Sequence, residues 1–131
     1  MKKLLALFSI LTCATVFAAD YYVDSTADAA VATGSSSAPF TTIKAAVDAA
    51  NAQYASDESS STIFVKGGDA SQYYIKTADD LISITAANLT ICKWPGFDNP
   101  KVHLDMALSE SVATPVVIMV EDNADFVTIR D

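Results

Sequence analysis

Apolar and polar positions divide the chain into an N-terminal apolar run, one stretch with helical spacing and a series of short alternating stretches. Residues 4–17 are almost all apolar and follow Lys2 and Lys3. A short basic start, an apolar run and small or branched residues before a cut ahead of Ala19 form the three-part layout of a secretory signal peptide. We therefore expect residues 1–18 to be a signal peptide that is removed on export.

Two other interpretations of this N-terminal segment stay open. The first is an uncleaved membrane anchor, although an apolar run of about 14 residues is shorter than the ~20 that a membrane-spanning helix needs. The second is lipid attachment at Cys13, which is disfavoured because Thr12 stands where a small Gly, Ala or Ser is expected. No later stretch is long enough to cross a membrane, so we expect a secreted protein, extracellular, on the cell surface or in the periplasm. The short Lys-Lys start is typical of a bacterial signal.

The stretch with helical spacing begins after Pro39, a residue that is tolerated in the first turn of a helix. Its apolar residues recur every three or four positions, as one buried helix face requires. These residues are Ile43, Val47, Ala50 and Tyr54. Polar residues such as Asn51 lie off this stripe. We predict a helix over residues 42–54, with Thr41 or Thr42 as its N-cap.

The remaining stretches are short, alternate apolar with polar residues and are separated by polar turns. They predict strands over residues 20–24, 62–65, 73–75, 81–84, 89–91, 102–104, 116–120 and 126–129. Residues 82–92 and 118–131 also share a strand–turn–strand pattern whose second strand contains Thr-Ile, and a solenoid would show such a repeat. The pattern therefore predicts an all-β body behind one N-terminal helix.

Composition narrows the classes of function. The chain has 131 residues, 16 acidic and 8 basic side chains and a net charge of −8. Such an acidic chain is unsuited to nucleic acid, whose phosphates are bound by Lys and Arg, and a hydrophobic content of 51% excludes an intrinsically disordered protein. Loss of residues 1–18 removes two lysines and no acidic residue, which makes the net charge −10. It also leaves Cys92 as the single cysteine, so no disulfide can form within the mature chain.

Several segments occur in an order typical of one family of secreted proteins. They are a strand at 21–24, a Gly/Ser loop at 34–37, the segment Pro39–Ala50, a strand ending in Gly at 62–68, a Tyr-bearing strand at 73–75 and the Asn-Leu-Thr-Ile of 88–91. Over residues 21–92 the chain resembles the beginning of a right-handed parallel β-helix protein of the pectin-lyase-like superfamily. The resemblance implies an all-β fold, the N-terminal portion of a parallel β-helix solenoid, with the amphipathic helix as its cap.

The same resemblance implies a role in polysaccharide degradation. Enzymes of this superfamily are polysaccharide lyases or glycoside hydrolases, and this chain would supply only the cap and first coils of one. Whether the whole protein is an enzyme stays open, and we expect the segment alone to be inactive. The alternative is a non-enzymatic surface adhesin or an autotransporter-like β-helix passenger, because β-helices host both functions. The expected partner is an extracellular polysaccharide.

The length after the predicted signal peptide is short for a solenoid. Only about two coils of sequence follow the helix, whereas solenoids generally need at least about three repeats for stability. We therefore expect residues 19–131 to be the N-terminal, capped part of a longer β-helix domain.

Candidate site residues are few. Glu121, Asp122 and Asp125 lie in one acidic turn whose oxygen ligands could hold Ca²⁺, although a solvated turn is the preferred interpretation; no other cofactor is expected. Sugar rings could stack on the aromatic faces of Tyr73, Tyr74, Trp94 and Phe97, of which Trp94 precedes Pro95-Gly96 in a predicted loop. A core position is the preferred interpretation for such residues. No catalytic residue can be assigned from the sequence.

Overall fold

The computed structural model describes residues 18–104, 118–120 and 127–130. Its one α-helix is α1 (Ile43–Asp57), and two short 3₁₀ turns are η1 (Ala29–Val31) and η2 (Ala78–Asp80). The strands are β1 (Ala19–Val23), β2 (Ser61–Val65), β3 (Gln72–Ile75), β4 (Ile82–Ile84), β5 (Leu89–Lys93), β6 (Lys101–Leu104), β7 (Ile118–Val120) and β8 (Thr128–Arg130). Within these described ranges the predicted helix and each predicted strand are confirmed in type, with ends that differ by a few residues.

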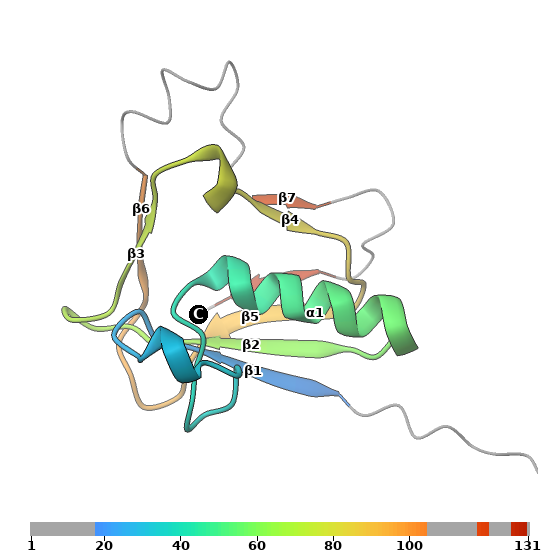
Figure 1. The fold of residues 1–131 in the computed structure, drawn as a ribbon, viewed down its shortest axis with the longest axis horizontal. Coiled ribbons are helices and arrows are strands. Elements are labelled where there is room, and N and C mark those ends of the chain that lie inside the picture. Colours follow the sequence, from blue (N-terminus) through green and yellow to red (C-terminus); the bar gives the residue numbers. More distant parts are fainter. Residues whose placement is uncertain (1–17, 105–117, 121–126, 131) are drawn as a thin grey trace, which may run out of the picture.

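All strand pairs within the sheets are parallel (Figure 1). The largest sheet has the order β1-β2-β5-β8, and two further sheets consist of β3-β6 and β4-β7. Parallel neighbours cannot be joined by a tight hairpin and need a longer crossover. Between β1 and β2 this crossover contains α1, and the chain leaves β2 to form β3 and β4 before it returns as β5.

The predicted fold class, an all-β right-handed parallel β-helix with a capping helix, is wrong. The described residues form a mixed α/β arrangement of one helix with short strands in small parallel sheets, and no solenoid is detected among them. The physical reason lies in α1, which packs on β1, β2 and β4 and buries Ala46, Val47 and Ala50 in the core. The sequence predicts a helix that caps a body of strands, whereas α1 forms one wall of the interior.

Both ends of α1 have capping interactions that the local sequence provides. The hydroxyl oxygen Oγ1 of Thr42 accepts a hydrogen bond from the backbone N–H of Ala45 at 3.1 Å, which confirms Thr42 as the N-cap. At the other end Glu58 adopts the left-handed conformation with φ 57°, and its N–H donates to the carbonyl of Tyr54 at 2.8 Å. These bonds satisfy backbone groups that the helix itself leaves free.

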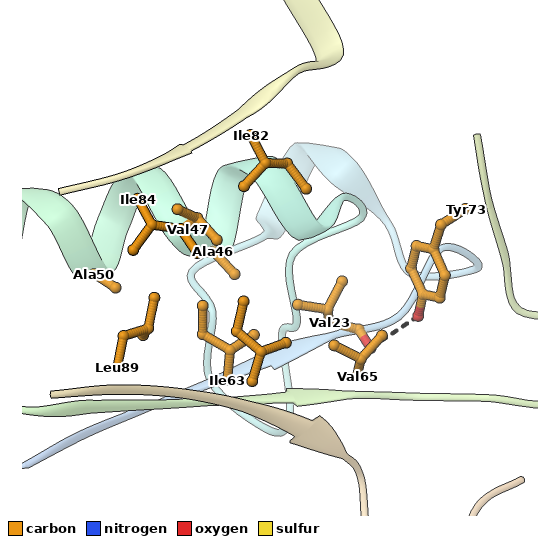
Figure 2. Close-up of a cluster of buried hydrophobic side chains, with 11 residues drawn as sticks. Val23, Ala46, Val47, Ala50, Ile63, Val65, Tyr73, Ile82, Ile84 and Leu89 are labelled. Atoms are coloured by element: carbon orange, nitrogen blue, oxygen red, sulfur yellow. Dashed lines mark hydrogen bonds between the residues drawn. The ribbon is translucent and has the colours of Figure 1, made fainter. Parts of the chain in front are cut away.

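The core lies between α1 and the largest sheet, with β4 closing it on another side (Figure 2). Residues of β2 alternate between buried and half-buried, and Ile63 and Val65 point inward. The buried side chains are Val23, Ala46, Val47, Ala50, Ile63, Val65, Tyr73, Ile82, Ile84, Leu89 and Ile91. Because of this alternation, the remaining side chains of the same strands lie on the outer face of the sheet.

No helix in the described ranges has the length and apolar character needed to span a membrane. Of the predicted signal peptide, residues 1–17 lie outside the described residues.

Candidate functional site

The outer face of the largest sheet carries a group of aromatic side chains, which we call the aromatic platform: Tyr22, Phe64, Trp94 and Phe97. Tyr22 of β1 and Phe64 of β2 are direct partners in the parallel register. Their neighbours Val23 and Ile63 are fully buried, so alternation along each strand turns Tyr22 and Phe64 to the opposite face. The platform is thus built on strands whose inner residues form the core.

The four rings of the platform form one connected series of contacts. Tyr22 and Phe64 stack with centroids 5.2 Å apart, and Tyr22 lies 4.8 Å from Trp94 at a tilt of 55°. Phe97 meets Trp94 edge-on at 5.3 Å. A shallow hollow of about 150 Å³ opens between Tyr22, Phe64, Trp94 and Pro95. The first three rings are half-buried and Phe97 is 40% exposed, so the platform stays accessible to a ligand.

Backbone hydrogen bonds hold Trp94 and Phe97 in place. The N–H of Trp94 donates to the carbonyl of Val65 at 2.9 Å, which extends the β2–β5 pairing beyond the end of β5. The N–H of Phe97 donates to the carbonyl of Trp94 at 3.2 Å and closes a turn that includes Gly96, whose φ is +88°. Glycine adopts this conformation without the steric cost that a Cβ would bring.

A row of threonine hydroxyls lies on the same face of the sheet. Thr62, Thr90 and Thr128 are in register on β2, β5 and β8, and Asp20 continues the row on β1. Neighbouring strands are about 4.8 Å apart, so the hydroxyls repeat at that interval across the sheet. The outer face therefore combines aromatic rings with a parallel row of groups that donate and accept hydrogen bonds.

An ion pair lies beside Phe97, one of the four rings of the platform. Nζ of Lys66 is 2.6 Å from Oδ2 of Asp24 and 5.1 Å from the centroid of the Phe97 ring. Burial by itself would raise the pKa of Asp24, but hydrogen bonds from Lys66 and Thr26 outweigh burial and hold the pKa below its ordinary value. Asp24 is 8% exposed and also accepts from Ser71 at 3.3 Å. The pair fixes the Lys66 ammonium against Phe97, where it attracts the ring electrostatically.

A second, polar hollow adjoins Phe97, and we call it the side cleft. It has a volume of about 420 Å³ and is lined by Gly68, Asp69, Lys93, Phe97, Asp98, Asn99 and Lys101. Lys101 pairs with Asp69 at 2.9 Å on the surface. The hydrogen bond between them lowers the pKa of Asp69 and raises that of Lys101. Phe97 lines this cleft and also contacts Trp94, so the cleft and the platform share one ring.

The structure places the aromatic candidates from the sequence in different environments. Trp94 lies in the platform, whereas Tyr73 is 5% exposed. The Tyr73 hydroxyl donates to the carbonyl of Val23 at 3.2 Å (Figure 2) and to the carbonyl of Lys66 at 2.8 Å. Burial raises the pKa of Tyr73 to about 12. The neighbouring Tyr74 is 53% exposed on β3, away from the platform's strands, and stacks on His103 at 5.0 Å.

The acidic turn with Glu121, Asp122 and Asp125 lies outside the described residues. Among the residues that the structure places, no group of three or more His, Cys, Asp or Glu could hold a metal ion. Cys92 is 8% exposed on β5, and burial raises the pKa of its thiol.

Sequence reasoning missed Tyr22 and Phe64 as members of the candidate site. Both lie in stretches that were correctly predicted as strands, but their proximity depends on the parallel register between β1 and β2. The signal that could have found them is the alternation of each strand, which assigns both rings to the outer face once the two strands are paired.

No protein family model, curated protein or solved structure matches the chain.

Proposed function

We propose that this chain is a secreted protein that binds an extracellular polysaccharide, and that the aromatic platform is its binding surface. The observation that carries the proposal is the contact of four aromatic rings on the outer face of a sheet whose inner face is core.

Aromatic faces suit sugar rings for a physical reason. The face of an aromatic ring carries negative quadrupole charge, and the C–H groups of a pyranose face carry weak positive charge, so the two stack favourably. The rings of the platform contact one another at 4.8 to 5.3 Å between centroids, and Phe97 is 40% exposed, so part of this aromatic surface is open to a sugar. A surface of several connected rings fits an extended polymer better than it fits a single small molecule.

The hydroxyl row supports the same ligand class. Sugar hydroxyls need partners that can both donate and accept, and threonine hydroxyls do both. Thr62 lies two residues before Phe64 on β2, so a glycan lying along this strand would meet both the hydroxyl row and the rings. Rings and hydroxyls hold a sugar but do not break a glycosidic bond, which in hydrolases usually requires a pair of carboxyl groups. The proposal is therefore one of binding.

This binding role is compatible with both hypotheses that the sequence raises. A polysaccharide lyase or hydrolase would use the platform to hold its substrate, and a surface adhesin would use it to attach to a glycan.

The single tryptophan of the chain provides the test, because Trp94 lies in the platform itself. The purified protein would be titrated with neutral hexasaccharides (cellohexaose, xylohexaose and mannohexaose) and with hexagalacturonate, and the fluorescence of Trp94 would be recorded. We expect saturable quenching by at least one glycan and a loss of affinity in Tyr22→Ala. The matched control is Tyr74→Ala, which removes an exposed aromatic ring elsewhere and should bind normally. Quenching by none of the four glycans would refute the proposal.

A further inference from the structure

We infer that the side cleft is a second subsite of the same glycan site and that it selects an uncharged, hydroxyl-bearing sugar residue. This inference rests on the proposed function of the platform. It assigns Asp98, Asn99 and Lys93 as the residues that determine specificity, with Phe97 as the wall shared by both subsites.

Continuity between the two subsites comes from Phe97. Its ring contacts Trp94 at 5.3 Å and also lines the cleft. A glycan that stacks on Trp94 and continues past Phe97 therefore enters the cleft without leaving the surface. The cleft volume of about 420 Å³ lies within the range of roughly 300–1,000 Å³ typical of small-molecule sites.

The wall of the cleft is held by close backbone packing. Gly67 is buried, and a Cβ at this position would overlap the carbonyl oxygen of Asp98 and the backbone of Asn99. The segment that carries these two residues therefore lies directly against the bend after β2. Such packing fixes the backbone that carries these side chains before a ligand arrives, which lowers the entropic cost of binding.

The charges of the cleft favour a neutral ligand. Asp69 and Asp98 balance Lys93 and Lys101, so the lining has no net charge, and Lys101 is already paired with Asp69. Among the described residues Lys93 has no hydrogen-bond or ion-pair partner, which leaves its ammonium available as a donor. A carboxylate, an amide and an ammonium beside an aromatic wall can donate to and accept from vicinal sugar hydroxyls. The acidic chain, with a net charge of −8, repels a polyanion at longer range.

The test compares short and long ligands in cleft variants. The neutral hexasaccharide that quenches Trp94 most strongly is titrated against its disaccharide, because only the longer ligand reaches both subsites. We expect Asp98→Asn and Asn99→Ala to weaken hexasaccharide binding by roughly fivefold to tenfold, the equivalent of about one hydrogen bond. Disaccharide binding on the platform should be unchanged in both variants. Asp79→Asn, an exposed aspartate on η2, is the matched control and should bind both ligands normally.

The outcomes separate this inference from the proposal on which it rests. If Tyr22→Ala loses affinity while both cleft variants bind the hexasaccharide as the parent does, the platform stands and the cleft is refuted as a subsite. If hexagalacturonate binds more tightly than every neutral hexasaccharide, the selection of an uncharged sugar is refuted. Thermal unfolding of each variant, with a midpoint near that of the parent, shows that a weaker affinity does not come from a lost fold.

Discussion

The side chain of Asn51 connects α1 to the chain around the end of β4, and its removal should measure what this connection contributes to stability. Oδ1 of Asn51 accepts hydrogen bonds from the backbone N–H groups of Thr85 and Ala86, each at 3.0 Å. Nδ2 donates to the carbonyl of Ser83 at 2.8 Å. One side chain thus makes three hydrogen bonds to a segment more than 30 residues away along the sequence.

The expected loss in Asn51→Ala follows from these bonds. Each contributes about 1 kcal/mol net, and water can replace part of this because the site is only partly buried, so the free energy of unfolding should fall by roughly 2–3 kcal/mol. With a urea dependence of about 1–3 kcal/mol per molar, the unfolding midpoint should fall by roughly 0.7–3 M. Urea unfolding followed by circular dichroism measures this shift.

The control for this experiment is Asp48→Ala. Asp48 is exposed on the same helix and pairs only with Lys44, so its loss should change stability by less than about 0.5 kcal/mol. A loss below about 1 kcal/mol in Asn51→Ala, or an equal loss in both variants, would show that the hydrogen bonds to Thr85 and Ala86 do not hold the helix in place.

Two further predictions concern buried ionisable groups. Lys66→Met leaves the carboxylate of Asp24 without its ion-pair partner and should lower the free energy of unfolding by roughly 2–3 kcal/mol at neutral pH. Because the folded pKa of Asp24 is lowered, its stabilising effect is present above its unfolded pKa and is lost as the pH falls. The difference in free energy of unfolding between variant and parent, measured by urea unfolding, should therefore shrink below about pH 4. An equal difference at every pH would contradict this. The pKa of Tyr73 is raised from 10.0 to about 12, so the parent should lose stability between these pH values, and Tyr73→Phe should not. At pH 7 the variant should be less stable by about 1–2 kcal/mol, because it lacks the hydrogen bonds of the hydroxyl. Spectrophotometric titration of the variant should also show one tyrosine fewer ionising near pH 12.

The secondary structure was predictable from the sequence because its signals are local. The apolar stripe of Ile43, Val47 and Ala50 and the cap at Thr42 define α1 over a few turns, and alternation defines β2 and β5. The arrangement of these elements was not predictable in the same way, since parallel pairing joins residues that are far apart in the chain. Tyr22 and Phe64, for example, are direct partners across a crossover that contains the whole helix.

Asn51 shows the same limit at a single position. It lies off the apolar stripe, where a polar residue is normally solvated, yet it makes three hydrogen bonds to the segment around the end of β4. Periodicity describes which side of a helix is apolar, but it carries no information about backbone groups that another segment brings to the polar side. Part of the candidate site was predictable, because Trp94 and Phe97 are aromatic residues in a predicted loop, whereas the positions of Tyr22 and Phe64 depend on register.

A change in the core also changes the platform, because the two occupy alternate residues of the same strands. On β2, Phe64 points outward between Ile63 and Val65, which are 0% and 2% exposed. A change at Ile63 would leave a cavity and shift the strand, and ring contacts at 4.8 to 5.3 Å would change with it. A change at Phe64 removes one ring and leaves the buried side chains in place. Outward-facing positions are therefore the ones at which glycan affinity and stability can be measured separately.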